Sequence, residues 1–530
     1  MDPADAFFTS GPLPHLHIEI DPHLLKSLDA NPKTPVRAMV RETVGKVEQI
    51  VYCDVAVHLK GGPGSFRQTN DKPALTLTFA HFVPGQSFHG LNKIHLNNSV
   101  QDGSYMCEYL GSYVFRESGC PAPRVSNARV WLNGRDLGPF VLKEGFDGVF
   151  FRKWFRDKSG NLYEGSFTDV DGNLPIHFGQ DPPEPRDPFD KAQIKAHERA
   201  VAEQRKAGEA RLRSLADAAR DPDPLKRRQR VDEVLDADRF LTFLACESMV
   251  AHWDGYGGNR NNYRIYDDPR GGRLVFLPQG MDQLFQRPDY SLFTNASLMG
   301  QVLTTQSPED RQRYIERIAR IRQTVFTPEA LLAQLDHVSG RLAPLMAEFG
   351  PGMLRHHKEE TAGLRQRLLE RIANIDRQLA NPPKPLQFDS NGLALFSPDQ
   401  WQPKQQEGNA DADKVGPDAR PRLFRVTCKP PGGAASWRTT VLLPQGRYTF
   451  EGRVKTIGVK PPPPGQNTAA GLRISGEKRT TRIFGDTDWQ TIRYDFQVDE
   501  ALREVVLVCD CAAEKGQTLF DPASLRLKRR

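Results

Sequence analysis

A proline-rich break divides this chain into two stretches whose apolar residues repeat with different periods. The segment ANPPKPLQF, residues 380–388, ends a helix because its consecutive prolines remove backbone donors. Before the break, GLRQRLLERIANIDRQL has apolar residues at helical spacing, whereas after it WRTTVLLP, GRYTFEGRVKT and REVVLVCD alternate apolar and polar residues. The change predicts a mainly helical stretch followed by an all-β domain over residues 383–530.

The stretch before the break contains two kinds of segment. Residues 15–151 consist mainly of short alternating segments with one helix among them, which is typical of a small mixed lobe. Residues 152–382 are predicted to be largely helical, with a charged, Ala-rich helical insertion at about 190–230 that follows the Pro-rich spacer DPPEPRDP. Because 530 residues exceed one ordinary core, we predict two or three domains. The two stretches before the break form an α+β part, and an all-β sandwich or jelly roll follows it.

Composition excludes several classes of protein. Lys and Arg total 72 against 66 Asp and Glu, a surplus too small to favour nucleic acid or an anionic membrane as the main partner. No apolar run is long enough for a transmembrane helix, and the start MDPADAFFTSGPLP lacks the features of a secretory signal. The seven cysteines form no CxxC pair, so we expect buried free thiols rather than a zinc site or a disulfide framework.

The most informative segment is HWDGYGGNRNNYRIYDDPRGGRLVFLPQGMDQLF, residues His252–Phe285. Asp254 is followed by Asn259 and Asn262, a strand hairpin is predicted next, and Asp282 stands directly after its second strand. Phosphoryl transfer depends on positioning and charge neutralisation more than on covalent work by the protein. One carboxylate could orient an acceptor hydroxyl, and a second, with an amide oxygen, could hold Mg²⁺ against phosphates.

The spacing of Asp254 and Asn259 equals that of the Asp and Asn in the protein-kinase catalytic loop. Taken alone, an Asp-x₄-Asn pair near glycines is more often a turn. The hairpin and Asp282, which lies next to apolar residues and has no evident turn role, favour a functional site.

The first lobe supplies further parts in the order found in kinases. LKGGPGSFRQ, residues Leu59–Gln68, is Gly-rich and lies between predicted strands, so its backbone could approach phosphates closely, although a plain hairpin loop fits as well. Lys72 follows this loop. Glu108 stands on the one helix of the lobe, for which Asp102 is the expected N-cap and Gly119 the expected stop. For Lys72 and Glu108, ordinary exposed residues are the alternative.

Other charged residues of this lobe could also meet a nucleotide. The hairpin NARVWLNGRDLGPFVLKEG turns at Asn133-Gly134 and ends in Lys143 and Glu144, where a kinase hinge would contact adenine. Arg67, at the end of the Gly-rich segment, could reach a phosphate.

With these residues in this order, the chain resembles the CotH kinase-like family. The resemblance runs through most of residues 15–300 and is carried by HLKGGPGSF with DKPALTLTF, GLNKIHLNNSVQDGSYMCEYLG, VWLNGRDLGPFVLKE, and HWDGYGGNRNNYRIY with FLPQGMDQLF. It implies an atypical protein-kinase fold that uses ATP and Mg²⁺ or Mn²⁺ to phosphorylate Ser or Thr in a protein substrate.

The resemblance also implies a role for each matching residue. By position, Asp254 would be the catalytic acid–base residue and Asp282 a metal ligand. The other implied ligands are Asn259 or Asn262 for the metal, and Lys72 paired with Glu108 for the nucleotide phosphates.

Two departures from the family pattern leave an inactive relative open. The commoner form near the second acid is Trp-Asp-x-Asp, whereas this chain has Gly-Met-Asp-Gln, so one potential metal carboxylate is missing. The charged insertion before Val231 is also long. The alternatives are a catalytically inactive structural or adhesion protein and, less favoured, a hydrolase with paired carboxylates. The amides and glycines around Asp254 fit metal–phosphate binding better than glycoside hydrolysis.

The C-terminal stretch, 383–530, resembles the carbohydrate-binding jelly rolls attached to secreted enzymes, through GRYTFEGRVKT and DWQTIRYDFQV. This resemblance implies a glycan as a possible partner, although any β-sandwich used for adhesion or packing would show the same alternation. Trp437 and Trp489 could be sugar platforms, but core packing is the favoured role. The family resemblance favours an extracytoplasmic, spore-coat or cell-envelope location, even though no export signal is visible.

Overall fold

The computed structural model of the chain divides into two compact units. Unit 1 comprises Met1–Leu303 and Gln312–Ala380, and unit 2 comprises Thr304–Arg311 and Asn381–Arg530, so the division falls within the proline-rich break. The structure describes residues 3–44, 48–179, 191–293, 295–305, 307–416, 422–461, 469–478 and 480–530. The predicted spacer DPPEPRDP lies outside these residues.

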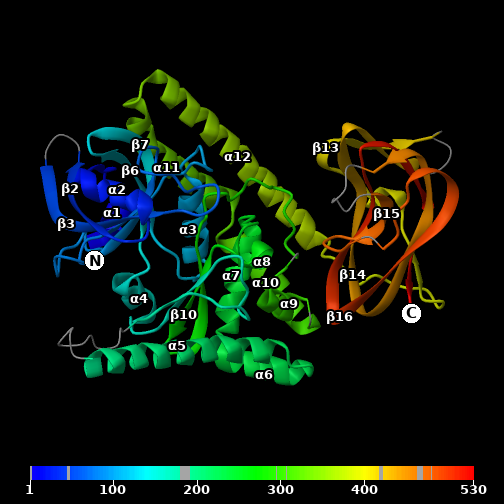
Figure 1. Cartoon of the computed structure of the whole chain (residues 1–530), viewed down its shortest axis with the longest axis horizontal. Helices are drawn as coiled ribbons and strands as arrows, with labels where there is room; N and C mark the ends of the chain where they lie inside the picture. The colour runs from blue at the N-terminus through cyan, green and yellow to red at the C-terminus, as the bar shows by residue number, and fades with distance from the viewer. Residues whose placement is uncertain are drawn as a thin grey trace. The chain divides into compact units, whose positions relative to one another are not determined.

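The first lobe of unit 1, residues 15–144, is a closed β-barrel, hereafter the barrel lobe (Figure 1). Its strands follow the order β1-β2-β3-β4-β5-β7-β6, and β1 closes the barrel by pairing in parallel with β6. The Asn133-Gly134 hairpin is confirmed, since both residues have positive φ, at 48° and 79°. The strands are β1 (His15–Ile20), β2 (Val36–Val44), β3 (Glu48–Lys60), β4 (Ala74–Thr78), β5 (Lys93–Asn97), β6 (Val125–Leu132) and β7 (Arg135–Glu144).

The prediction of one helix in this lobe is wrong, because α2 (Pro22–Ala30) lies between β1 and β2, and α1 (Pro3–Thr9) precedes the barrel. The helix that matters for the site is α3 (Cys107–Glu117). The prediction that Asp102 is its N-cap is wrong, because α3 begins later and Met106 is the cap. The Asp102 carboxylate instead closes the preceding turn by accepting from Ser104, and also accepts the Cys107 N–H at 3.0 Å. Gly119, with a φ of 86°, follows the helix as expected.

The second lobe, residues 148–303 and 312–380, is hereafter the helical lobe. Its small sheet has the order β11-β10-β8-β9, and the predicted hairpin after Asn262 is the pair β10 and β11. Its strands are β8 (Leu162–Gly165), β9 (Ile176–His177), β10 (Tyr263–Asp268) and β11 (Arg273–Pro278). The helices that begin within it are α4 (Gly148–Phe155), α5 (Lys191–Ala219), α6 (Pro224–Val234), α7 (Ala237–Met249), α8 (Tyr256–Asn259), α9 (Leu298–Thr304), α11 (Pro328–Ala347) and α12 (Pro351–Ala380), and α10 (Pro308–Thr324) enters it from unit 2.

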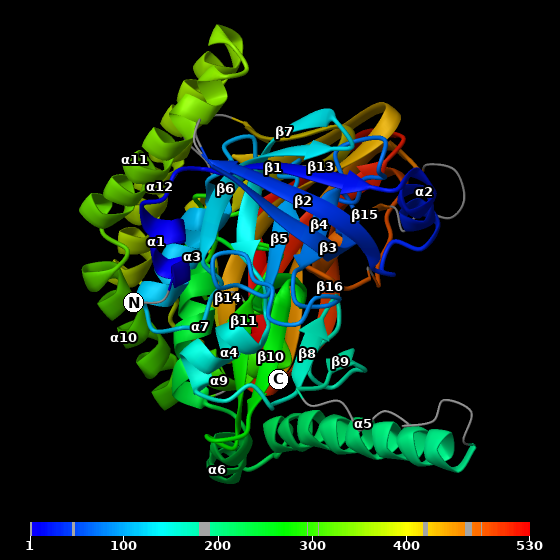
Figure 2. The same cartoon turned by 90° about the vertical axis from the view of Figure 1, so that its left-hand side faces the viewer.

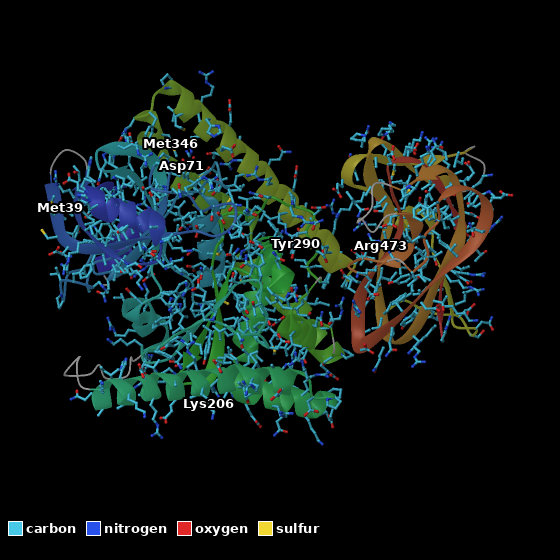
Figure 3. All side chains as sticks on the ribbon, in the orientation of Figure 1. Met39, Asp71, Lys206, Tyr290, Met346 and Arg473 are labelled. Atoms are coloured by element: carbon cyan, nitrogen blue, oxygen red, sulfur yellow. The ribbon has the colours of Figure 1, made fainter. Side chains whose placement is uncertain are left out.

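The predicted charged insertion forms the helices α5 and α6, which run along one edge of unit 1 (Figure 2). The N-terminal part of α5 is largely exposed, and Lys206 marks this part in Figure 3. The C-terminal part is buried through residues such as Leu212 and Leu215. The first part of α5 therefore lies on the surface, whereas its last part packs into the core of unit 1.

Arg371 on α12 fixes the backbone on both sides of the candidate site loop. Its fully buried guanidinium donates to the carbonyls of Ser248 at 2.7 Å, Met249 at 3.0 Å and Pro288 at 3.1 Å, and also to that of Tyr290. Tyr290 is marked in Figure 3 within the helical lobe. One side chain thus satisfies carbonyls at the end of α7 and in the segment after β11.

Beyond the proline-rich break, unit 2 consists almost entirely of strands around one apolar core, which confirms the predicted change of period. Trp437 packs in this core at 2% exposure, with its ring 4.3 Å from that of Phe424, whereas Trp489 is partly exposed. The strands are β12 (Leu393–Leu395), β13 (Gln402–Val415), β14 (Leu423–Lys460), β15 (Ala469–Ile474), β16 (Gly485–Ala513) and β17 (Lys515–Arg529), with the short helix η1 (Pro398–Gln400).

The cysteines are free thiols, and the prediction that they are buried holds for all except Cys53. Cys53 is exposed on β3 beside Asp54, whose φ of 50° marks an irregularity in that strand. Among the described helices, none has the length and apolar character needed to cross a membrane.

We expect Arg371→Ala to lower the free energy of unfolding by about 2–4 kcal/mol, because it removes the donor from the Met249 and Pro288 carbonyls. The Ser248 and Tyr290 carbonyls keep the Ala251 N–H and Gln378 Nε2 as donors. Chemical denaturation of the full chain measures this change. The matched control is Arg365→Ala on the same helix, since Arg365 makes only an exposed ion pair with Asp336 and should change stability by about 0.5 kcal/mol or less. Equal losses in the two variants would contradict the role given to Arg371.

Candidate functional site

A cavity of about 1220 Å³ in unit 1 is lined by residues of both lobes. Its wall includes the Gly-rich β3–β4 loop, the ends of β5 and β7, α3, the loop after α7 and the segment after β11. The structure brings five predicted site residues to this wall: Glu108, Asp254, Asn259, Asn262 and Asp282. Residues separated by more than a hundred positions in the sequence therefore converge on one space.

Three amide side chains hold the carboxylate of Asp254. Its Oδ1 accepts from Asn259 Nδ2 at 2.6 Å, and its Oδ2 accepts from Asn262 Nδ2 at 2.8 Å and Asn261 Nδ2 at 3.1 Å. These three hydrogen bonds fix the direction in which the carboxylate points. The sequence analysis did not single out Asn261, although it stands beside Asn262 in the same Asn-rich segment.

The loop that carries Asp254 is fixed by a buried acid at the end of α7. Glu247 accepts the N–H groups of Tyr256 and Gly257, each at 2.9 Å, and so satisfies the first turn of α8. Glycine allows this close approach, because a Cβ on Gly255 would lie 2.4 Å from Glu247 Oε1. His252 ties the loop to the next segment by donating from Nε2 to the Gly280 carbonyl at 3.1 Å.

A close contact between α3 and the segment after β11 places Glu108 near Asp282. A Cβ on Gly111 would lie 2.4 Å from Leu284 Cδ1, so only glycine permits this approach. Burial, and then the nearby charge of Glu108, raises the pKa of Asp282 to about 6. This carboxylate therefore stands in a region where a cation would stabilise its charge.

The predicted pairing of Lys72 with Glu108 is wrong. Glu108 Oε2 instead accepts from Lys143 Nζ at 2.9 Å, and both side chains are buried. Lys143 is directed to α3 by the register of β7 against β5, where it lies opposite His95. Lys72 precedes β4 and donates to the Tyr105 hydroxyl at 3.0 Å, away from the cavity wall.

Lys60 also lines the cavity, and the sequence analysis did not select it. Its Nζ donates to Asn97 Oδ1, and Asn97 Nδ2 donates to Glu108, so Asn97 links Lys60 to the carboxylate that Lys143 contacts directly. Burial, and then the charge of Lys143, lowers the pKa of Lys60 to about 7. Burial alone would raise the pKa of Glu108, but Lys143 and Lys60 outweigh it and hold that pKa below its ordinary value. The sequence signal that could have identified Lys60 is its position as the last residue of β3, directly before Gly61 and Gly62.

Arg67 and Glu144 do not reach the cavity wall. Arg67 closes its own loop by donating to the Gly64 and Phe66 carbonyls, and it pairs at 3.2 Å with Asp71, which is labelled in Figure 3. Glu144 is buried and accepts from Arg124 at 2.7 and 3.0 Å. Both side chains therefore have local partners, whereas Gly61, Gly62, Pro63 and Ser65 of the same loop do line the cavity.

The cavity wall carries more positive than negative side chains, which suits an anionic ligand. The basic residues are Lys33, Lys60, Lys93, Lys143, Arg152, Lys158 and Arg264, and the acidic ones are Glu108, Asp147, Glu164, Asp254 and Asp282. No group of three or more His, Cys, Asp or Glu side chains in the described part of the chain could hold a metal ion alone. Mg²⁺ commonly takes one or two carboxylates together with substrate phosphates, and the cavity wall offers Asp282 as well as the amides of Asn259 and Asn262.

Comparisons with known proteins agree with the order of these motifs. The family model described as "CotH kinase protein" matches residues 58–349. "Spore coat protein homolog 1" of Rhizopus delemar is 21% identical over 297 residues, which cover 54% of this chain and 44% of that protein. "Inner spore coat protein H" of Bacillus subtilis is 22% identical over 273 residues, which cover 50% of this chain and 72% of that protein. The chain thus spans less than half the length of the Rhizopus relative.

Solved structures give more distant likenesses. A proinflammatory kinase, CtkA, of Helicobacter pylori is 8% identical and covers 62% of this chain and 98% of its own, with a TM-score of 0.28. TmCBM61 in complex with β-1,4-galactotriose is 13% identical and covers 26% of this chain and 91% of its own, with a TM-score of 0.19. TM-scores this low add nothing to the fold described above.

The raised pKa of Asp282 makes stability depend on pH. Because its folded-state pKa of about 6 lies above the ordinary value of 3.8, the folded protein binds this proton more tightly than the unfolded chain, and stability falls as pH rises through about 4 to 6. Asp282→Asn cannot ionise. We expect it to stabilise the protein by about 1–2 kcal/mol near pH 7.5, a value discounted for partial solvent contact, and to change little near pH 4.

Thermal melting at both pH values measures this difference. The exposed Asp289 lies in the same segment, so Asp289→Asn is the control and should alter neither melt. An Asp282→Asn variant that is less stable than the parent at the higher pH would contradict this prediction. It would show that neighbouring groups stabilise the ionised carboxylate of Asp282 in the folded protein.

Proposed function

The chain belongs to the CotH kinase protein family, and from this premise we propose that the cavity of unit 1 binds ATP with Mg²⁺ or Mn²⁺ and transfers the γ-phosphate to a Ser or Thr hydroxyl of a protein. The observation that carries the proposal is that Asp254 and Asp282 line one cavity together with Lys60 and Lys143. A carboxylate for the acceptor, one for a cation and two cationic side chains for phosphates are the parts that this chemistry needs.

Each of these residues has a role that follows from its contacts. Asp254, held by its amides, would accept the hydroxyl proton and orient the acceptor. Lys143, directed by Glu108, and Lys60 would donate to phosphate oxygens. Asp282, with Asn259 or Asn262, would hold the divalent cation, which when bound neutralises charge on the phosphates.

Both relatives are described as spore coat proteins. We therefore propose a protein substrate and a location in a spore coat or cell envelope for this chain. An inactive structural or adhesion protein is the second candidate, and the missing carboxylate in Gly-Met-Asp-Gln is what favours it.

Transfer of labelled phosphate from ATP, with the metal varied, tests the kinase proposal. We expect Asp254→Ala and Asp282→Ala each to lower transfer by about 10²-fold or more while the protein still folds, because positioning and charge neutralisation are lost. Lys143→Ala should cost about 10²-fold for the same reason. Lys72→Ala is the matched control, since Lys72 lies outside the cavity wall, and should leave transfer within about threefold.

Two outcomes would oppose the proposal. Labelling by Asp282→Ala equal to that by the parent would remove Asp282 from the mechanism. If the protein binds ATP with Mg²⁺, a nucleotide concentration about a hundredfold above Kd should raise its free energy of unfolding by about 2.7 kcal/mol. No shift in melting, together with no transfer, would favour the inactive structural protein.

We further propose that unit 2 binds a glycan, and Trp489 is the residue that favours this. Its ring is partly exposed on β16, and the Arg453 guanidinium lies 5.5 Å from the ring centre. Next to it, Asp488 pairs with Lys455 at 3.3 Å. An exposed aromatic ring bordered by polar groups is a surface on which a sugar ring can stack and form hydrogen bonds. Trp437 is excluded from this role because it is buried.

We expect Trp489→Ala to weaken retention on polysaccharide by about fivefold or more, because the stacking surface is lost. Affinity electrophoresis of the full chain through gels that contain different soluble polysaccharides measures retention. Leu395→Ala is the control, since Leu395 is an apolar residue of unit 2 that is 68% exposed. If Trp489→Ala is retarded as strongly as the parent by every polysaccharide that retards the parent, Trp489 is excluded from glycan binding.

A further inference from the structure

The surplus positive charge of this chain lies beyond the proline-rich break. Residues 381–530 contain 23 Lys and Arg against 17 Asp and Glu, whereas residues 1–380 contain 49 of each kind. A surplus confined to one part of a chain indicates an anionic partner for that part. Residues 381–530 form all of unit 2 except one short segment, and unit 2 is the part for which we propose glycan binding.

Some of this charge gathers on one exposed face of three neighbouring strands, β16, β14 and β17. Side chains that stand opposite each other in a sheet point to the same side. The register places Glu451 of β14 opposite both Arg493 of β16 and Arg526 of β17. Arg453 of β14 and Trp489 of β16 alternate with these residues on the same side. These five residues are hereafter the basic face.

Two arginines of the basic face share one carboxylate. Glu451 Oε2 accepts from Arg493 Nε at 2.9 Å, and its Oε1 accepts from Arg526 Nε. The Glu451 side chain is only 9% exposed, whereas those of Arg493 and Arg526 are 69% and 45% exposed. Within the described part of the chain, neither guanidinium makes a further hydrogen bond. Glu451 therefore orients two guanidiniums from beneath and cancels the charge of only one.

The remaining donors of these guanidiniums match an anionic group on a ligand. Nη1 and Nη2 of an arginine can donate together to both oxygens of a carboxylate. Arg493 and Arg526 stand on the strands that flank β14, so their backbones are about 10 Å apart. The Arg453 guanidinium lies 5.5 Å from the Trp489 ring centre. A cationic group thus stands beside the ring for which we propose sugar stacking.

Acidic side chains around the basic face limit the charge density of a partner. Asp488 pairs with Lys455 at 3.3 Å. Asp495 pairs with Arg530 at 2.8 Å. A nucleic-acid duplex carries one charge per roughly 1.7 Å of its axis, so it would bring phosphates against these carboxylates. A chain of uronic acids carries one carboxylate per sugar, which spaces its charges more widely, and its rings offer the apolar surface that Trp489 can contact.

We infer that the basic face binds an acidic polysaccharide whose sugars carry carboxylates. Arg453, Arg493 and Arg526 donate to these carboxylates, while Trp489 stacks on a sugar ring. The inference rests on the glycan binding proposed for unit 2 and names the class of glycan. It is independent of the kinase activity proposed for unit 1.

Binding of the full chain to immobilised polygalacturonate, alginate and hyaluronan, measured by biolayer interferometry at physiological ionic strength, tests this inference. The methyl ester of each polymer has the same sugar backbone without the charge. We expect the parent to bind at least one of the three acids about tenfold more tightly than its ester.

Two substitutions then test the arginines. Arg493→Gln and Arg453→Gln should each weaken binding to that acid about fivefold and leave binding to the ester unchanged, because a charge-assisted contact is lost. Arg453→Gln leaves both contacts of Glu451 in place, so it remains informative if Arg493→Gln lowers the melting temperature.

The matched control is Lys478→Gln, which removes one exposed positive charge on the other side of β16. The Lys478 carbonyl accepts from the hydroxyl of Tyr494, a core residue that alternates with Arg493 along β16. Lys478→Gln should bind like the parent. Equal weakening by this control would show that only overall charge matters and would overturn the inference.

Three further outcomes separate this inference from the glycan proposal. A parent that binds neutral polysaccharides but none of the three acids would overturn the inference and leave glycan binding intact. Equal binding of acid and ester, or binding of single-stranded DNA as tight as that of the acid, would also overturn it. Absence of binding to every polysaccharide would overturn both.

Discussion

The buried ion pair between Lys143 and Glu108 is the interaction on which the arrangement of unit 1 depends. It joins the last strand of the barrel lobe to α3. Through Gly111, α3 in turn contacts the segment that carries Asp282. A buried pair of this kind is costly unless its remaining hydrogen-bonding groups are satisfied. Asn97 bridges Glu108 to Lys60 and so extends the pair into a network. The positions of Lys143 in the barrel lobe and of Asp282 in the helical lobe are therefore linked through α3.

The candidate catalytic loop is held by a different device, which uses backbone groups rather than charge pairs. Glu247 satisfies the start of α8, Arg371 satisfies carbonyls on both sides of the loop, and His252 links it to the segment that leads to Asp282. The Asp254 carboxylate then needs only its amides to fix its direction. Such prior organisation is what transfer chemistry requires, because reorganisation during the reaction would raise the barrier.

The same cavity contains groups that destabilise the protein when no ligand is bound. Lys60 has a lowered pKa, Asp282 a raised one, and Asp147 an acceptor oxygen without a donor. In the nucleotide complex that we propose, phosphates would relieve the cost at Lys60 and a cation the cost at Asp282. Functional sites commonly lower the stability of the ligand-free protein, and a bound ligand restores that stability.

The sequence by itself determined the features that depend on neighbours in the chain. These were the change of period at the proline-rich break, the Asn133-Gly134 hairpin, and the loop in which Asp254 stands a few residues from Asn259 and Asn262. Only the tertiary structure decided which lysine meets Glu108 and which acids line the cavity. Lys72 follows the Gly-rich loop as the pattern suggested, yet the register of β5 against β7 places Lys143 at α3 instead. Spacing along the chain specifies local turns and periodicity, whereas a partner in space depends on strand register and on helix contacts such as that of Gly111, which no single segment contains.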